Sequence, residues 1–127
     1  MGQRYLIDTN VLIDFFNGRL PEDAKSLLFS IEPIISVITH IELFSSKNAS
    51  EAELLQLKSF VKSATVYNYL TPEIVNKTID IRLQTNLKTP DAIIAATALA
   101  NGLVILSRNV KDFDRVKGLE IANPYAL

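Results

Sequence analysis

The sequence contains no cysteine and only one histidine among its 127 residues. Without cysteine the protein has no disulfide scaffold, no thiolate zinc site and no cysteine nucleophile. A single histidine excludes a metal site built from several imidazole groups. If the protein binds a metal ion, oxygen atoms are therefore the ligands that remain for it.

Long apolar runs and glycine-rich motifs are also missing. No stretch of about 18 apolar residues occurs, and the N-terminus lacks a signal-peptide pattern, so we expect a cytoplasmic protein without a membrane partner. Neither Gly-x-Gly-x-x-Gly nor Gly-Lys-Ser/Thr is present, which argues against a nucleotide-binding domain. The length, with 48% hydrophobic and 21% charged residues, is typical of one globular domain spanning residues 1–127.

Opposite charges nearly cancel, since 13 basic and 14 acidic residues give a net charge of −1. This balance argues against a duplex-DNA binder that works by charge alone. The distribution is uneven, because six basic residues but only three acidic ones lie between Arg82 and Lys117. The window either reflects ordinary scatter of charge or forms a basic rim around a site in the C-terminal third.

Short apolar runs alternate with longer helical patterns along the chain. We expect strands at residues 5–7, 33–35, 64–67, 103–106 and 119–121. We expect helices at residues 11–17, 21–31, 37–46, 51–62, 71–85 and 89–101. Thr9 or Asn10 is the expected cap of the first helix, Pro21 the expected first residue of the second, and Ser36 and Ser50 the caps of the next two. Strands separated by helices, with no hairpin signal, predict an α/β fold with a mostly parallel sheet.

Carboxylates recur where the strands of this sheet end. Asp8 follows the first strand directly, Glu42 lies among apolar residues on the helix after the second, and Asp91 begins a helix that is apolar nearly all round. Asp112 and Asp114 come shortly after the fourth strand. Sites in parallel sheets lie beyond the carboxyl ends of the strands, so these residues are candidates for function. Helix capping, ion pairing and solvation are the structural alternatives for each of them.

Converging carboxylates repel one another and raise each other's pKa, which a divalent cation relieves. Hard oxygen ligands favour Mg²⁺ or Mn²⁺ over Zn²⁺ or copper. Such an ion neutralises a phosphodiester, lowers the pKa of bound water and stabilises the leaving oxygen. An acidic cleft beside a basic rim therefore indicates phosphodiester hydrolysis. His40 is two residues from Glu42 and does not share its helix face, so we expect a structural or surface role for it. Asp14 is expected on a solvated helix face.

Four stretches of the chain resemble the PIN-domain ribonucleases, most closely the VapC-like toxins of type II toxin–antitoxin pairs. They are YLIDTNVLI at 5–13, ISVITHIEL at 35–43, TPDAIIAA at 89–96 and LSRNVKDF at 106–113. No single stretch is specific, because Asp-Thr-Asn after a strand is common. Four of them in the family's order, spanning almost the whole chain, are strongly specific.

The resemblance implies a three-layer α/β/α sandwich around a mostly parallel sheet of four or five strands. It also implies Mg²⁺- or Mn²⁺-dependent endoribonuclease activity. By position, Asp8, Glu42 and Asp91 match the first three acidic residues of the family. The fourth place is open between Asp112, Asp114 and a weaker neutral role for Asn109; we take Asp112 as the fourth catalytic and metal-binding residue.

Further roles follow from the same resemblance. Asn10 and Ser107 match polar residues that position the acids or the metal-bound water, and Asn109 is a third supporting polar residue. Arg108, Lys111 and Arg115 are expected to contact flanking phosphates of the RNA substrate. The family also implies a homodimer and a cognate antitoxin whose C-terminal segment lies in a groove near the active site. The apolar residues of the helix at 51–62 serve either the core or such an interface.

Other functions remain as alternatives. A response-regulator receiver needs an acidic pair after the first strand and an aspartate after the third, where this chain has Asp8 alone and Asn68. A haloacid-dehalogenase-type phosphatase needs Asp-x-Asp, and Asn10 occupies the second of those places. The strongest alternative is a catalytically weak PIN-like binding module that acts through a protein partner. The retained acidic residues favour the enzyme.

Overall fold

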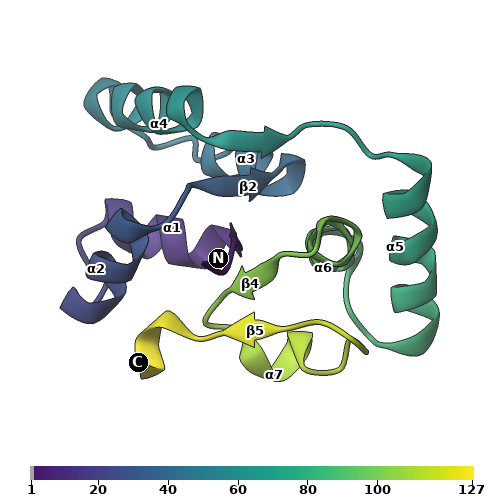
Figure 1. Ribbon diagram of the computed structural model, residues 1–127. Helices are drawn as coiled ribbons and strands as arrows, with labels where there is room; N and C mark the ends of the chain where they lie inside the picture. Colours follow the sequence, from purple (N-terminus) through teal and green to yellow (C-terminus); the bar gives the residue numbers. More distant parts are fainter. Residues whose placement is uncertain (1) are drawn as a thin grey trace.

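The computed structural model describes residues 2–127 (Figure 1). The elements in chain order are β1 (Tyr5–Ile7), α1 (Thr9–Phe16), α2 (Glu22–Ser30), β2 (Ile34–Ser36), α3 (Val37–Leu43), α4 (Glu51–Ser63), β3 (Thr65–Tyr67), α5 (Pro72–Gln84), α6 (Thr89–Asn101), β4 (Val104–Leu106), α7 (Val110–Phe113), β5 (Ile121–Ala122) and the 3₁₀ helix η1 (Pro124–Ala126). None of the helices in residues 2–127 has the length and apolar character needed to cross a membrane.

All paired strands are parallel, as the sequence predicts. β1 pairs with β4 so that Leu6 lies opposite Ile105, β4 pairs with β5, and β2 pairs with β3. β1 and β2 are in contact, but no hydrogen-bonded ladder joins them in the described part of the chain. The strands therefore lie in the order β3-β2-β1-β4-β5, as two parallel ladders side by side.

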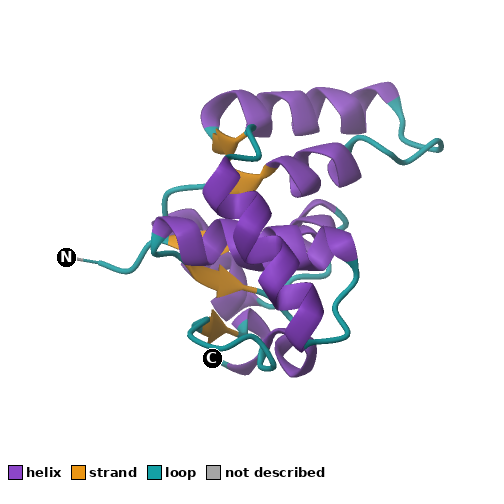
Figure 2. Cartoon of the chain, turned by 90° about the vertical axis from the view of Figure 1, so that its right-hand side faces the viewer, coloured by secondary structure: helices purple, strands orange, loops and turns teal. Residues whose placement is uncertain are grey.

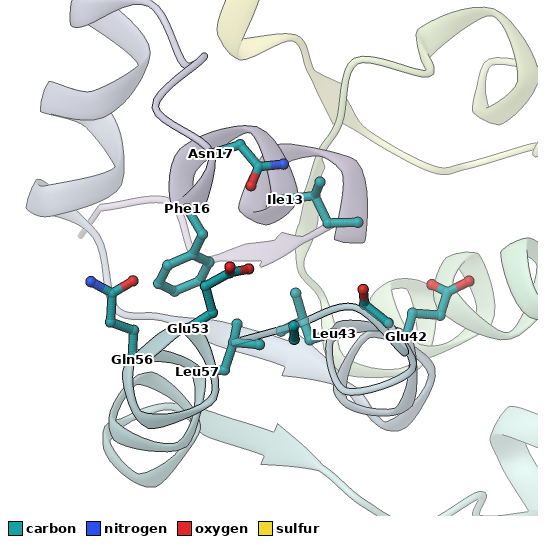
Figure 3. A pocket seen from close by; sticks show the side chains of 10 residues that line it. Ile13, Phe16, Asn17, Glu42, Leu43, Glu53, Gln56 and Leu57 are labelled. Atoms are coloured by element: carbon teal, nitrogen blue, oxygen red, sulfur yellow. The ribbon is translucent and has the colours of Figure 1, made fainter. Parts of the chain in front are cut away.

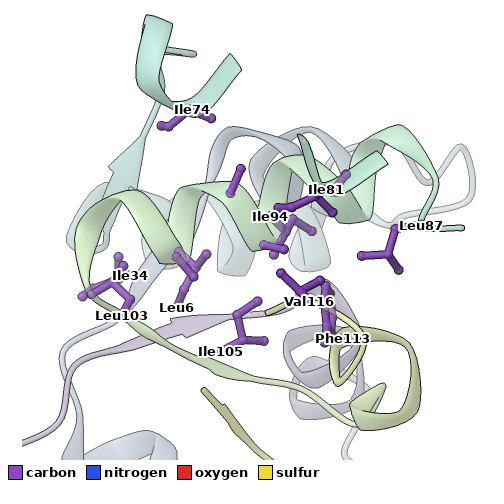
Figure 4. Close-up of a cluster of buried hydrophobic side chains, with 14 residues drawn as sticks. Leu6, Ile34, Ile74, Ile81, Leu87, Ile94, Leu103, Ile105, Phe113 and Val116 are labelled. Carbon is purple, nitrogen blue, oxygen red and sulfur yellow. The ribbon is translucent and has the colours of Figure 1, made fainter. Parts of the chain in front are cut away.

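Helices cover both faces of the strands, which confirms the expected three layers. Successive strand residues point to opposite faces of a sheet. Leu6, Ile34 and Ile105 pack with buried side chains of α5, α6 and the α7 region (Figure 4). Ile7, Ile35 and Leu106 pack on the other side with residues of α1, α2, α3 and α4. Figure 2, seen from the side of α5, shows helices lying in front of the strands.

The helix α6 has the largest number of buried residues among the helices of residues 2–127, and its sequence explains why. Its buried residues are Ala92, Ile94, Ala95, Ala96, Thr97 and Ala98. Small alanine side chains let α6 lie close to the sheet on one side and to α5 on the other. Gly102 ends the helix with a φ of 63°, a left-handed conformation that glycine adopts without a steric cost. The position of Asp91 in the first turn of α6 is thereby fixed relative to the strands.

Several element boundaries differ from the sequence prediction. α1 begins at Thr9 and its cap is Asp8, whose side chain accepts a hydrogen bond from the Thr9 amide, so the expected caps Thr9 and Asn10 are wrong. Pro21 precedes α2 as its cap residue and does not form its first turn. α3 ends at Leu43, three residues early, and the last strand is Ile121–Ala122. The four-residue helix α7 is too short for a periodic pattern to predict.

Candidate active site

The strand order reverses next to β1. From β1 the chain proceeds to β2 on one side, while β4 lies on the other side. In parallel α/β sheets such a switch point leaves a crevice beyond the carboxyl ends of the two strands. Asp8 follows the last residue of β1, and Ser107 follows the last residue of β4. The topology thus brings the first predicted carboxylate and a predicted supporting hydroxyl to the same place.

Asp8 is a buried carboxylate held by three donors. Its Oδ1 accepts a hydrogen bond of 2.8 Å from the Thr9 amide. Its Oδ2 accepts bonds of 2.7 Å from Ser107 Oγ and 3.1 Å from Asn10 Nδ2. Burial raises the pKa of Asp8 and outweighs these hydrogen bonds, which lower it, while the charge of Glu42 raises the pKa further. Asn10 and Ser107 therefore lie where the sequence places them, directly on the first acid.

Glu42 is fixed by a pair of threonines that the sequence reasoning missed. Thr9 Oγ1 lies 2.6 Å from Glu42 Oε1 and 2.9 Å from Thr39 Oγ1. Because a hydroxyl carries one proton, Thr9 donates to the carboxylate and accepts from the fully buried Thr39. Thr39 lies three residues before Glu42 on α3, and this spacing on one helix face was the available signal. The exposed Glu42 is thus held at the site and is not a free surface charge.

The causes of the raised pKa of Asp91 indicate which carboxylates lie near it. Burial raises its pKa most, and the charges of Asp8, Glu42 and Asp112 raise it further. The other three predicted acids therefore all lie close enough to Asp91 for their charges to act on it. Asp114 is exposed and is not among the charges that act on Asp91, so Asp112 is the nearer of the two candidates for the fourth place.

Asn109 and Lys88 complete the polar surroundings of the acids. The Asn109 amide donates a hydrogen bond of 2.9 Å to Ser107 Oγ, which orients that hydroxyl toward Asp8. Asn109 thus supports the site through its backbone. The charge of Lys88 lowers the pKa of Asp91. Lys88 belongs to the basic window of the sequence. Its position just before α6 did not indicate that its charge would act on Asp91.

The three predicted phosphate contacts lie on one segment of the chain but differ in their surroundings. Lys111 and Arg115 are exposed and form no ion pair within residues 2–127. Arg108 Nη1 lies 2.8 Å from Asp14 Oδ2. The expectation that Asp14 is solvated is therefore wrong, since this residue is 7% exposed and bonded to Arg108 and Tyr125. A partner 94 positions away leaves no local signal in the sequence.

A groove of about 260 Å³ runs between α1, α3 and α4 and reaches Glu42 (Figure 3). Its walls carry the apolar side chains of Ile13, Phe16, Leu43 and Leu57. A second carboxylate, that of Glu53 on α4, also lines it. On α4, Leu57 is buried in the core whereas Leu55 is 67% exposed, so the core alternative is confirmed for Leu57 and the interface alternative stays a prediction.

The PIN domain family matches residues 5–119. The chain belongs to the PIN domain family. Ribonuclease VapC1 of Rickettsia felis is 31% identical to this PIN domain, over 91% of this chain and 92% of its own length. The tRNA(fMet)-specific endonuclease VapC of Salmonella typhimurium is 30% identical over 93% and 96%. A solved toxin–antitoxin complex from Klebsiella pneumoniae contains a similar chain, with a TM-score of 0.79, 32% identity and coverage of 97% and 99%.

The donor chemistry of this PIN domain fits a hard divalent cation. Oxygen atoms are the ligands present. Burial raises the pKa of Asp91 most, and the neighbouring carboxylates raise it further, which a bound cation would relieve. No group of three or more acidic or histidine side chains in residues 2–127 already surrounds one point as metal ligands. Mg²⁺ is commonly held by only one or two carboxylates and several waters, so a pair such as Asp8 and Asp91 meets its requirement.

Proposed function

We propose that this PIN domain is a Mg²⁺- or Mn²⁺-dependent endoribonuclease and the toxin of a toxin–antitoxin pair. The carrying observation is the place of Asp8 at the switch point, where Asn10 and Ser107 hold its carboxylate and where the charges of Asp8, Glu42 and Asp112 all act on Asp91. The similarity to relatives that are named ribonuclease and endonuclease supports the choice of RNA as substrate. The reaction is hydrolysis, in which water adds to phosphorus and one P–O bond of the RNA chain breaks.

Asp8 and Asp91 are the proposed principal metal ligands, with Glu42 and Asp112 completing or supporting the shell. When bound, the ion supplies charge neutralisation of the phosphodiester and a lowered pKa of water. Three hydrogen bonds keep the Asp8 carboxylate in one orientation. Thr9 occupies Glu42 Oε1, which leaves Oε2 to accept a hydrogen bond from the attacking water.

Arg108, Lys111 and Arg115 are the proposed contacts to RNA phosphates on either side of the cleaved bond. All three follow β4, in the segment that also carries Asp112. Lys88, whose charge acts on Asp91, is a further candidate for such a contact. A basic rim around an acidic centre attracts the RNA backbone and leaves the acids free to bind the cation.

The groove beside Glu42 is the proposed docking place for a cognate antitoxin. Apolar walls with two carboxylates suit an amphipathic segment that carries a basic side chain. A basic group placed next to Glu42 would compete with the metal for the same charge. The similarity to a chain from a toxin–antitoxin complex supports this partner.

A homodimer is proposed through the outer face of α5. Val75, Ile79 and Leu83 are exposed at intervals of four residues and form one apolar stripe along the helix. The exposed Tyr69 and Leu70 lie just before α5. Figure 1 shows α5 at the outer edge of the molecule, where a second copy can approach. An apolar stripe facing its own copy buries the same side chains from both protomers.

Cleavage of RNA by the wild type and by Asp8→Asn, each with and without Mg²⁺, tests the proposal. We expect cleavage by the wild type only when the metal is present, and loss of cleavage in the variant. Metal-independent cleavage, or full activity of Asp8→Asn, would contradict it. Titration of the wild type with Mn²⁺ by calorimetry distinguishes the binding-module alternative, because such a module keeps the fold and loses the metal.

A further inference from the structure

Three segments far apart in the sequence meet at Asp14. Asp14 lies on α1, Arg108 lies between β4 and α7, and Tyr125 lies in η1 near the C-terminus. Asp14 Oδ2 accepts a hydrogen bond of 2.8 Å from Arg108 Nη1 and another from the Tyr125 hydroxyl. The Arg108 guanidinium carbon also lies 5.5 Å from the centre of the Tyr125 ring, within the range of a cation–π contact.

This cluster adjoins the carboxylates. Arg108 directly follows Ser107, and its amide donates a hydrogen bond of 3.4 Å to Asn10 Oδ1. Asn10 and Ser107 in turn donate to Asp8. Asp14 lies four residues after Asn10 on α1, one turn further along the same helix face. The Arg108 side chain is therefore anchored along α1, one helical turn from the network that holds Asp8.

The three side chains differ in solvent exposure, and the difference suits an anchor that holds Arg108 in place. The Asp14 side chain is 11% exposed, whereas that of Arg108 is 56% exposed. Burial, together with the hydrogen bond and charge of Asp14, raises the pKa of Tyr125 to about 12, so its hydroxyl keeps its proton and remains a donor to Asp14. An arginine has five N–H donors, and only one of them is occupied by Asp14.

We propose that Asp14 and Tyr125 are positioning residues, which hold the Arg108 guanidinium ready for a phosphate of the RNA backbone. The inference rests on the proposed ribonuclease function and adds two residues to it. A long side chain that is already held by a carboxylate and an aromatic ring loses little freedom when it binds a ligand. The exposed N–H groups of Arg108 then meet the phosphate in a fixed direction.

Two variants distinguish a role of Asp14 and Tyr125 in positioning Arg108 from a simple effect of charge on RNA binding. Asp14→Asn removes a negative charge from the RNA-binding side, so charge alone would tighten RNA binding, whereas loss of the anchor weakens it. Tyr125→Phe keeps both the charge and the aromatic ring and removes only the hydrogen bond to Asp14. If Asp14→Asn fails to fold, Tyr125→Phe still decides the question, since the phenol has a single bonded partner within residues 2–127.

The experiment measures the Kd of a fluorescein-labelled single-stranded RNA by anisotropy with Mg²⁺ present, in an Asp91→Asn background that leaves the hydrogen bonds of Asp8 in place. We expect Arg108→Gln to raise the Kd about tenfold. Asp14→Asn and Tyr125→Phe should each raise it roughly threefold, and neither should raise it further once Arg108 is Gln. Lys62→Gln, at the end of α4 before β3, is the matched control for loss of one basic charge.

An unchanged Kd in Tyr125→Phe, tighter binding in Asp14→Asn, or effects that persist in the Arg108→Gln background would each overturn the inference. In those cases loss of cleavage in Asp8→Asn would leave the proposed function standing. Failure of the background protein to bind the RNA at all, together with full cleavage by Asp8→Asn, would overturn the proposed function and the inference together.

Discussion

Ser107 Oγ and Asp8 Oδ2 are joined by a hydrogen bond of 2.7 Å, although the two residues are 99 positions apart. The bond links the ends of β1 and β4 at the point where the strand order reverses. It also opposes the effect of burial on the Asp8 pKa. The same contact thus joins the part of the site that follows β1 to the part that follows β4, and it favours the ionised form of Asp8.

Ser107→Ala is expected to raise the pKa of Asp8 further, because burial then acts with one opposing hydrogen bond fewer. Asp8 would bind its proton more tightly in the folded state, so the acid limb of the cleavage profile should move to higher pH. The variant should lose about 1–2 kcal/mol of stability near pH 7, and less below the pKa of Asp8. Urea denaturation checks this against Ser63→Ala, which removes an exposed hydroxyl. An acid limb that does not shift would contradict the assignment of this limb to Asp8.

Asp91→Asn is expected to stabilise the metal-free protein near pH 7. The pKa of Asp91 is raised in the folded state, so its stabilising contribution is present below its ordinary pKa of 3.8 and is lost as pH rises through the raised pKa. Because asparagine carries no charge, the variant avoids that loss of stability. This gain should outweigh the loss of the favourable interaction between the Asp91 charge and the helix dipole, which is worth about 0.3–1 kcal/mol. Thermal melts in EDTA should show the largest gain at pH 7 and little gain near pH 3.5. Glu73→Gln, in the first turn of α5, is the control, and an equal gain there would refute the cause given.

Thr9→Val is expected to reduce cleavage roughly 10- to 100-fold, because it removes the hydroxyl that orients Glu42. Valine fills the same space, so the midpoint of urea denaturation should change little beyond the loss of the two hydrogen bonds. Thr9→Ser keeps the hydroxyl and should retain most of the activity. Equal activity of the two variants would show that Glu42 does not depend on Thr9.

Mg²⁺ is expected to raise the melting temperature of the wild type. An ion that binds only the folded state at ten times its Kd adds about 1.4 kcal/mol, or about 5 °C for a domain of this size. Asp8→Asn and Asp91→Asn should lose most of this shift, whereas Asp114→Asn should keep it. A shift of equal size in all four proteins would point to nonspecific ion binding.

Ile79→Glu is expected to convert the proposed homodimer to a monomer, because it places a charge in the middle of the apolar stripe on α5. Light scattering coupled to size exclusion gives the mass directly. Leu55→Glu is the matched control, since this residue is also apolar and is even more exposed, 67% against 51%, but lies on α4. A monomeric wild type, or a dimer that survives Ile79→Glu, would contradict the assignment of this face.

Helix starts were predictable where a local signal fixes them. Ser50 caps α4 in a capping box with Glu53, and Thr71 caps α5 immediately before Pro72. Both signals lie within four residues of the helix that they begin. The start of α1 was missed because Thr9 or Asn10 was preferred as its cap, although helix capping was one of the alternatives for Asp8. The two roles coincide, since Asp8 bonds the Thr9 amide with one oxygen and Ser107 with the other.

The sequence by itself determined the class of fold and the kind of chemistry. Apolar runs that end in acids placed Asp8, Glu42 and Asp91 near strand ends, and the lack of cysteine left oxygen atoms as the ligands for any metal ion that binds there. The tertiary structure alone decided which distant side chains meet there. The parallel register of β1 and β4 sets Ser107 beside Asp8, and the return of the C-terminus past α1 buries Asp14 under Arg108 and Tyr125. Local sequence patterns indicate helical or strand periodicity and helix caps, whereas contacts between residues far apart in the sequence depend on the register of whole strands and helices.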